Sequence, residues 1–267
     1  MSVDYHHLTT EEAREFCAAG GVVVVPIGAT EQHGPHLPLG TDFTMAHTVA
    51  TKAAEQVDGV LVTPPIWTGF SPHHMQFTGT VSLRAETLMA VVRDVAESLW
   101  RHGFRRILFL NGHGGNMNML GSAAQALRFE SGVRITVASY WNFATDVIAQ
   151  WRRSPLGGIN HACEMETSLM LAAHGAQVQA DKARNTPETM RNRYLGNDLL
   201  GGGAVATPWD FAEVTADGTL GHPEEATAER GAELLAAVVD GVAGFLTDFK
   251  TWDWQDPRTI IGRDDER

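Results

Sequence analysis

Short apolar segments that run directly into glycine-rich polar loops constrain this chain more than any other feature. Residues 22–27 read VVVVPI and lead into Gly28, and residues 107–110 read ILFL and lead into NGHGGN. Apolar runs without polar alternation are typical of strands buried on both faces, as in parallel sheets. Two further strands are predicted over residues 59–63 and 133–140.

Helical patterns separate these segments. Apolar residues recur at helical spacing over 85–102, and we also predict helices over 43–57, from about 116 to 128, from within HACEMETS to Gly175, and from about 223 to 246. Beyond residue 180, GGG and TPWDF indicate loops that serve a site. Strands that alternate with helices predict an α/β fold whose mostly parallel sheet is covered by helices on both faces.

Length and charge narrow the class of protein. The 267 residues suffice for one large core, so we expect a single domain over 1–249 and a polar tail over 250–267. The net charge of -12 argues against a nucleic-acid partner, because backbone phosphates are bound by clustered Lys and Arg. No segment approaches the roughly 20 apolar residues that span a bilayer, and no basic and apolar leader begins the chain. We therefore expect a cytoplasmic protein without a membrane partner.

Polar clusters follow the predicted strands. The segments GATEQHG, SPHHMQ and NGHGGN contain four of the chain's twelve histidines. Ligands of open parallel sheets bind outside the carboxyl ends of the strands, so these loops should meet at one edge. A single site built from all three is the prediction.

The first and third loops carry residue types that suit a metal centre. Glu31 and His33 are two apart, so both side chains can project from one side of an extended segment, and Asp42 closes the same loop. His113 lies among glycines that allow close backbone approach. Carboxylates and imidazoles without thiolates suit Zn, Mn or Fe, and Asp42 can bridge two ions. The alternative is a phosphate-binding turn, although NGHGGN matches neither a dinucleotide loop nor a Walker motif.

Two further clusters leave alternatives open. In HACEMETS, helix-dipole and capping effects explain at least one of Glu164 and Glu166, and the other is a candidate ligand. His73 and His74 either contact substrate or belong to the loop structure. Trp67, Phe70, Trp141 and Trp209 could line a flat pocket, but we favour the core for each and leave them out of the predicted site.

Taken together, GATEQHGPHLPLGTD, FTGTVSL, ILFLNGHGGN and HACEMETSLML resemble the creatininase family in order and spacing, over the chain up to about residue 245. The resemblance implies a three-layer α/β sandwich, a homohexamer and two divalent ions per subunit. One ion would take Glu31, Asp42 and His113. The other would take His33, Asp42 and a further carboxylate.

That last carboxylate distinguishes this chain from creatininase itself, which resembles it but carries an acid where this chain has Gly115. Relatives with NGHGGN draw the ligand from the HACEMETS helix, and we favour Glu166 over Glu164. The family also includes relatives that act on formamide-bearing pyrimidines, on cyclic polyol ketones and on a peptide. Membership in the family would therefore indicate the type of reaction but not the particular substrate.

The expected reaction is hydrolysis of a C–N bond in a small molecule by a metal-activated water. His161 resembles the family's proton-shuttling histidine, and Glu164 is a second catalytic candidate. Predicted substrate contacts are Ser71, His73, His74, Gly114 and Gly115. Two rival hypotheses are a covalent nucleophile, Ser71 or Cys163, and a metal-dependent binding protein without catalytic activity.

Overall fold

A four-stranded parallel sheet forms the centre of the computed structural model, which describes residues 3–184, 194–196, 198–201, 203–256 and 258–261. The strand order is β2 (Val60–Val62), β1 (Val22–Ile27), β3 (Arg106–Asn111) and β4 (Thr136–Ser139), and every neighbouring pair is parallel. The residues of β1 and β2 are all buried, as expected for uninterrupted β-branched runs.

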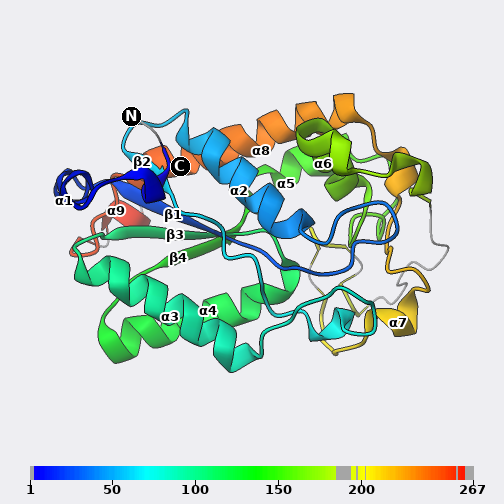
Figure 1. The fold of residues 1–267 in the computed structure, drawn as a ribbon, viewed down its shortest axis with the longest axis horizontal. Helices are drawn as coiled ribbons and strands as arrows, with labels where there is room; N and C mark the ends of the chain where they lie inside the picture. Colours follow the sequence, from blue (N-terminus) through cyan, green and yellow to red (C-terminus); the bar gives the residue numbers. More distant parts are fainter. Residues whose placement is uncertain (1–2, 185–193, 197, 202, 257, 262–267) are drawn as a thin grey trace.

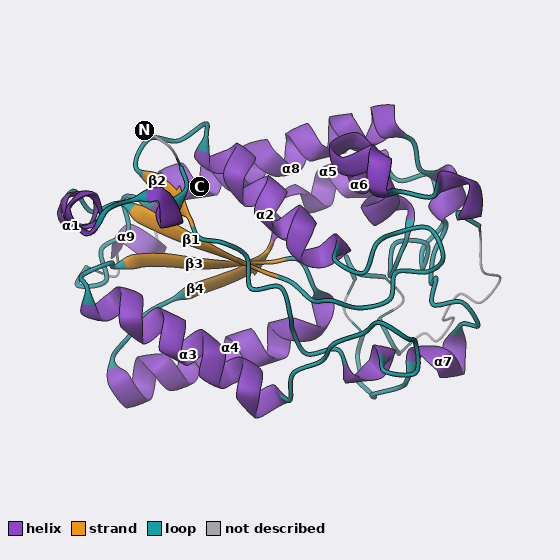
Figure 2. Cartoon of the chain, viewed as in Figure 1, coloured by secondary structure: helices purple, strands orange, loops and turns teal. Residues whose placement is uncertain are grey.

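Helices cover both faces of the sheet (Figure 1, Figure 2). One face packs against α2 (Thr41–Ala54), α6 (Glu164–His174) and α8 (Ala228–Phe249). The opposite face packs against α3 (Ala85–Arg101) and α4 (Met117–Ala126). Alternate residues of β1 feed the two cores, with Val22 and Val24 in one and Val23 and Val25 in the other. The predicted three-layer α/β sandwich is confirmed.

Element boundaries differ from the prediction mainly at the ends. The predicted helix from 223 begins later, at Ala228, because the Thr227 side chain accepts a hydrogen bond from the backbone N–H of Arg230 and caps the helix there. The strand predicted over 133–140 is shorter, and α4 continues as a π-helix over Leu127–Ser131 before Gly132 adopts a left-handed conformation with φ 75°.

The remaining helices are short and peripheral: α1 (Thr10–Ala18), α5 (Thr145–Trp151), α7 (Phe211–Val214) and α9 (Arg258–Ile261). Helix α1 begins at a capping box between Thr9 and Glu12, a signal that is legible in the sequence TTEE. Helix α7 lies beside the loops at the carboxyl edge of the sheet, whereas α1 and α9 lie at the opposite end (Figure 1).

The described part of the tail packs on the domain. Trp252 and Trp254 are partly buried against the α8 side of the core, and the Trp254 indole N–H donates to the carbonyl of Arg105 at 2.6 Å. This part of the tail is therefore packed against the domain. Among the described residues, no helix is long and apolar enough to cross a bilayer.

Candidate metal centre

The loop after β1 brings the first ligand candidates to the carboxyl edge of the sheet. Gly28 ends the strand where an added Cβ would lie only 2.3 Å from the backbone nitrogen of Phe43, so the chain passes directly over the start of α2. Glu31 and His33 follow, and Asp42 stands in the first turn of α2; all three are buried. The tight passage at Gly28 is what allows the loop and the helix to share one centre.

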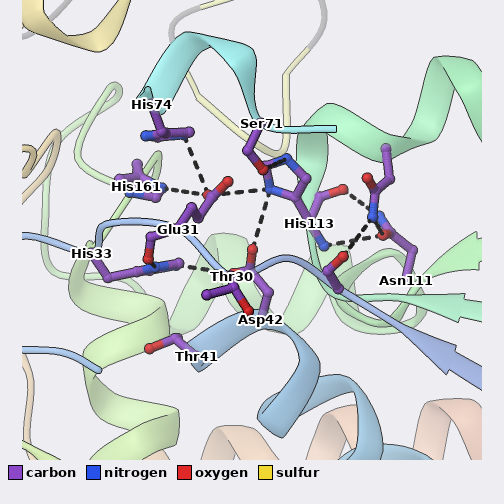
Figure 3. Close-up of polar contacts among 12 residues, drawn as sticks. Thr30, Glu31, His33, Thr41, Asp42, Ser71, His74, Asn111, His113 and His161 are labelled. Carbon is purple, nitrogen blue, oxygen red and sulfur yellow. Dashed lines mark hydrogen bonds and ion pairs between the residues drawn. The ribbon is translucent and has the colours of Figure 1, made fainter. Parts of the chain in front are cut away.

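The candidate ligands converge on one another (Figure 3). Nε2 of His33 lies 2.9 Å from Oδ1 of Asp42, and Nδ1 of His113 lies 3.2 Å from both Oδ2 of Asp42 and Oε1 of Glu31. Oε1 of Glu166 lies 3.9 Å from Nε2 of His33. Among the described residues, three groups of ligand atoms are each compact enough for one ion. Two of them share Asp42: Glu31 with Asp42 and His113, and His33 with Asp42 and Glu166. The third is Glu31 with His33 and His161.

Buried polar atoms in this cluster lack hydrogen-bond partners. Both carboxylate oxygens of Glu31, Oδ2 of Asp42 and Nε2 of His33 are shielded from solvent and make no hydrogen bond of acceptable geometry. Leaving such groups unpaired costs about 1–3 kcal/mol each, and more for charged groups. Convergent oxygen and nitrogen lone pairs are the donor set that Zn, Mn and Fe accept, so the residues fit a divalent centre.

Outer contacts orient the histidine lone pairs toward the cluster. Nε2 of His113 donates to the carbonyl of Phe70 at 3.0 Å, and Nδ1 of His33 donates to the carbonyl of Glu31 at 3.2 Å. In each ring the nitrogen that faces away carries a proton, so the other nitrogen can offer its lone pair to a metal once it is deprotonated. Histidine ligands of metals are typically oriented by such contacts.

Asparagines fix the turn that carries His113. The Asn111 side chain accepts from the backbone N–H of His113 at 3.1 Å and donates to its carbonyl at 2.6 Å. Asn116 donates to the carbonyl of Gly28 at 3.0 Å and accepts from the backbone N–H of Phe70 at 2.9 Å. These contacts join the loops after β1, β2 and β3, as the rule for parallel sheets predicts.

The electrostatics of the cluster favour protons on the atoms where a metal would compete. Burial alone lowers the pKa of His33, but the Asp42 carboxylate, then Glu166 and Glu31, raise it to about 10. Burial raises the pKa of Glu166 to about 7, although His33 acts in the opposite direction. For His113, burial is outweighed by Glu31 and Asp42, so its pKa is raised. A cation held here replaces these protons.

Glu166 and Glu164 point in different directions from the start of α6. Glu166 faces the cluster, and its Oε2 also accepts from the backbone N–H of Cys163 at 3.3 Å. The Glu164 carboxylate instead accepts from Arg230 at 2.6 Å and from the backbone N–H groups of Arg153 and Ser154. This placement does not support the predicted catalytic role of Glu164 and makes it part of the packing between α6 and α8.

Most of the other predicted site residues line a cavity of about 200 Å³, which Glu31, Asp42, His113 and Glu166 also line. His73, His74, Gly114, Gly115 and His161 line it. Ser71 does not line the cavity, and its hydroxyl lies 3.3 Å from Nε2 of His113 behind the centre. Cys163 does not line it either, and burial, followed by the Glu166 carboxylate, raises the pKa of its thiol well above the usual value. Neither rival nucleophile faces the cavity.

Several lining residues were not in the predicted site. Trp141 and Trp209, which were assigned to the core, line the cavity, together with Asn160, Leu199 and Phe211. Phe211 packs against His74 and His161 with ring centroids 4.0 and 4.8 Å apart. Phe211 and Trp209 belong to TPWDF, which was predicted as a loop that serves the site, although Phe211 itself was not predicted as a site residue. Trp67 stays largely exposed and Phe70 borders a neighbouring groove.

Comparison with known proteins shows which family this chain belongs to. The model of the family described as Creatininase, creatinine amidohydrolase, matches residues 6–246. The chain belongs to the creatininase family. It is 33% identical over 264 residues to a creatinine amidohydrolase of Pseudomonas putida, covering 92% of this chain and 97% of that protein. It is 34% identical over 246 residues to a mycofactocin precursor peptide peptidase of Mycolicibacterium smegmatis, covering 88% of each.

Solved structures of creatininases share the fold. A crystal structure of creatinine amidohydrolase (creatininase) superposes with a TM-score of 0.81 at 31% identity, covering 94% of this chain and 99% of that one. Others are a creatininase described with Mn and a creatininase variant described as Zn-Zn type, each 32% identical. Family membership and the donor set together identify this protein as a metal-dependent amidohydrolase of the creatininase family.

One family position is closed to an acid in this member. A Cβ added at Gly115 would lie 2.4 Å from Nε2 of His113 and 2.8 Å from the carbonyl oxygen of Phe70. Real Cβ atoms do not approach backbone so closely, so no side chain fits at residue 115 without displacing His113 or the loop. The acid that the resemblance assigns to this position in creatininase therefore has no counterpart at residue 115, and the carboxylate that lies with His33 and Asp42 is that of Glu166.

Proposed function

We propose that this creatininase-family enzyme holds two divalent ions, Zn, Mn or Fe, that Asp42 bridges. Glu31 and His113 complete one set of ligands, and His33 and Glu166 complete the other. The observation that carries the proposal is the pair of compact ligand groups sharing Asp42, whose buried oxygens and nitrogens lack hydrogen-bond partners. Such a pair of ions supplies Lewis acidity and a water acidic enough to attack at neutral pH.

The residues around the ions would serve hydrolysis of a C–N bond in an amide, a cyclic amide or a formamide. The cavity of about 200 Å³ suits a small molecule or one end of a larger one. His161 lies 3.7 Å from Glu31 through Nδ1, and burial, followed by His33, lowers its pKa. A neutral imidazole at this place can accept a proton and pass it to the leaving nitrogen. Trp209 and Phe211 exclude water from one wall.

The test is metal content and hydrolysis in matched variants. Asp42→Asn should lower the zinc or manganese content from about two ions per chain to one or fewer and abolish hydrolysis, because a bridging ligand serves both ions. Asp94→Asn on the exposed side of α3 makes the same change of charge and should alter neither. Elemental analysis is paired with a panel of creatinine, N-formyl amides and short peptides. Unchanged metal content in Asp42→Asn would refute the bridged centre.

A peptide substrate is the second candidate. A groove of about 570 Å³ adjoins the cavity at His73 and Trp209, and Phe70, Pro72, Asp210 and Glu213 also line it. A segment extending from the cavity would lie there, and the two carboxylates favour a positively charged one. The mycofactocin precursor peptide peptidases among the relatives act on a peptide by name. Hydrolysis of basic peptides in preference to small amides in the same panel would favour this reading.

We also propose a cytoplasmic homohexamer that acts without nucleic-acid or membrane partners. The support is the family resemblance together with exposed apolar side chains on the loops around the site: Leu39, Trp67, Met75 and Val81. Clustered apolar residues on a surface are typical of subunit contacts. Light scattering on the purified protein gives the mass directly, and a monomer at micromolar concentration would refute the assembly.

A further inference from the structure

Gln32, between two proposed metal ligands, uses both ends of its side-chain amide. It is only 5% exposed. Its Oε1 accepts from the backbone N–H of Gly34 at 2.9 Å, and its Nε2 donates to the carbonyl of Gly218 at 3.1 Å. Because the oxygen has a donor partner and the nitrogen has an acceptor partner, the orientation of this amide is fixed.

The fixed amide assigns the proton of His74. The second N–H of Gln32 Nε2 points at Nδ1 of His74, 2.8 Å away. An amide nitrogen can only donate, so Nδ1 of His74 must accept, and the ring proton must lie on Nε2. That nitrogen lies 3.3 Å from Oε1 of Glu31 on the wall of the cavity. His74 therefore presents an N–H group there and has no lone pair for a metal.

The backbone of the same residue assigns the proton of His161. Nε2 of His161 lies 2.6 Å from the carbonyl oxygen of Gln32, which can only accept. The proton is on Nε2, and Nδ1 is bare and lies 3.7 Å from Oε1 of Glu31. The two rings are neighbours with centroids 4.4 Å apart, and Phe211 packs against both.

We propose that Gln32 is a positioning residue that holds the proton on Nε2 in two neighbouring histidines, so that a protonated nitrogen of His74 and a bare nitrogen of His161 face Glu31. The catalytic part of this proposal rests on the proposed hydrolysis. There, the Nε2–H of His74 faces Oε1 of Glu31 at 3.3 Å and attracts the carboxylate electrostatically, while His161 keeps a lone pair for the proton in transfer. His74 acts through Glu31 and is not itself a metal ligand.

Neutron crystallography of the zinc-loaded protein in heavy water reads these protons directly. In the wild type, deuterium should lie on Nε2 of His74 and on Nε2 of His161, with neither Nδ1 labelled. In Gln32→Glu, the new carboxylate accepts, so deuterium should appear on Nδ1 of His74. His161 should not change, because its partner is a backbone carbonyl. Deuterium on Nδ1 of His74 in the wild type, or no deuterium there in Gln32→Glu, would overturn the proposal.

Zinc affinity measured by chelator competition tests the positioning role without any substrate. Partners of metal ligands typically contribute 10- to 100-fold in affinity, so we expect a loss of about that size in Gln32→Glu and in Gln32→Met, which carries no donor. Gln125→Glu, exposed on α4, adds the same charge and should leave affinity unchanged. Wild-type affinity in folded Gln32→Met would overturn the positioning role. The deuterium positions are measured without any substrate, so they can still be determined if no compound in the activity screen is hydrolysed.

Discussion

Replacing Glu164 and Glu166 separately by glutamine should produce opposite phenotypes, although the residues are two apart on one helix. The Glu164 side chain is wholly buried and pairs with Arg230, whose side chain is 12% exposed, at 2.6 Å. Glu166 instead belongs to the group of ligand atoms with His33 and Asp42. We expect Glu164→Gln to lower stability at unchanged metal content and Glu166→Gln to lower metal content.

The magnitude for Glu164 follows from its contacts. Two backbone N–H groups, of Arg153 and Ser154, and the Arg230 guanidinium all donate to this carboxylate. Removing one charge from a buried ion pair costs about 3–5 kcal/mol, because the other charge stays buried without compensation. In a chain of this size about 1 kcal/mol shifts Tm by roughly 2 °C, so the expected loss is about 6–10 °C.

Glu166→Gln should behave differently in the metal-free protein. Burial raises the pKa of Glu166 to about 7, so much of this carboxyl is protonated at neutral pH and a neutral amide replaces it at little cost. The amide oxygen also retains the contact with the backbone N–H of Cys163. With one ligand of the second ion weakened, zinc content should fall from about two to about one per chain.

Elemental analysis and thermal unfolding of both variants, with and without zinc, separate these outcomes. The reasoning about the two carboxylates would be refuted by loss of zinc in Glu164→Gln with Tm unchanged. It would also be refuted by full zinc content in Glu166→Gln. Arg230→Met serves as a matched control for the ion pair, and it should lower Tm without lowering metal content.

Three further outcomes are expected. In the folded protein the pKa is raised to about 7 for Glu166 and to about 10 for His33. The contribution of each group to the stability of the metal-free protein is therefore lost as pH rises, between about 4.5 and 7 for Glu166 and between about 6.5 and 10 for His33. Zinc needs the deprotonated ligands, so the zinc-induced rise in Tm should grow from about pH 5 to about pH 9, and a flat difference would contradict this. Gly231→Ala places a Cβ 1.8 Å from a backbone oxygen of α6 and should cost at least about 1–3 kcal/mol in urea unfolding. On the same helix Gly244→Ala meets nothing within 4 Å and should add about 0.5–1 kcal/mol. Gly115→Ala should lower zinc affinity, since its Cβ would lie 2.4 Å from a ligand imidazole nitrogen.

Much of the fold was predictable from local patterns. The run VVVVPI coincides with β1, and helix α3 ends within one residue of its prediction, because strand burial and helical amphipathicity are properties of neighbouring residues. Boundaries were less predictable where a cap decides them, as Thr227 does for α8.

The site was predictable in part. Loops after parallel strands meet at one edge, which is sufficient to bring Glu31, Asp42 and His113 together. Phe211 lies in TPWDF, which was predicted to be a loop that serves the site, but no local pattern singled out this residue within the loop. Trp141 belongs to the buried core, as predicted, and also lines the cavity. Trp209 lines the cavity although the core was favoured for it, since a large aromatic residue in a cavity wall has the same local signature as one in the interior.

The sequence by itself determined the alternation of strands and helices, the family, and the residue types that a divalent centre needs. Only the tertiary structure decided between Glu164 and Glu166. On a helix, side chains two apart point about 200° from each other, so one of the two has to face away from any given site. Which one does so depends on Arg230 in α8. The proton placement on His74 likewise depends on Gly218, 186 residues after Gln32. The Gly218 carbonyl fixes the orientation of the Gln32 side-chain amide, and that amide determines which nitrogen of the His74 ring carries the proton. Contacts at such separations are made by packing, and no local pattern in the chain encodes them.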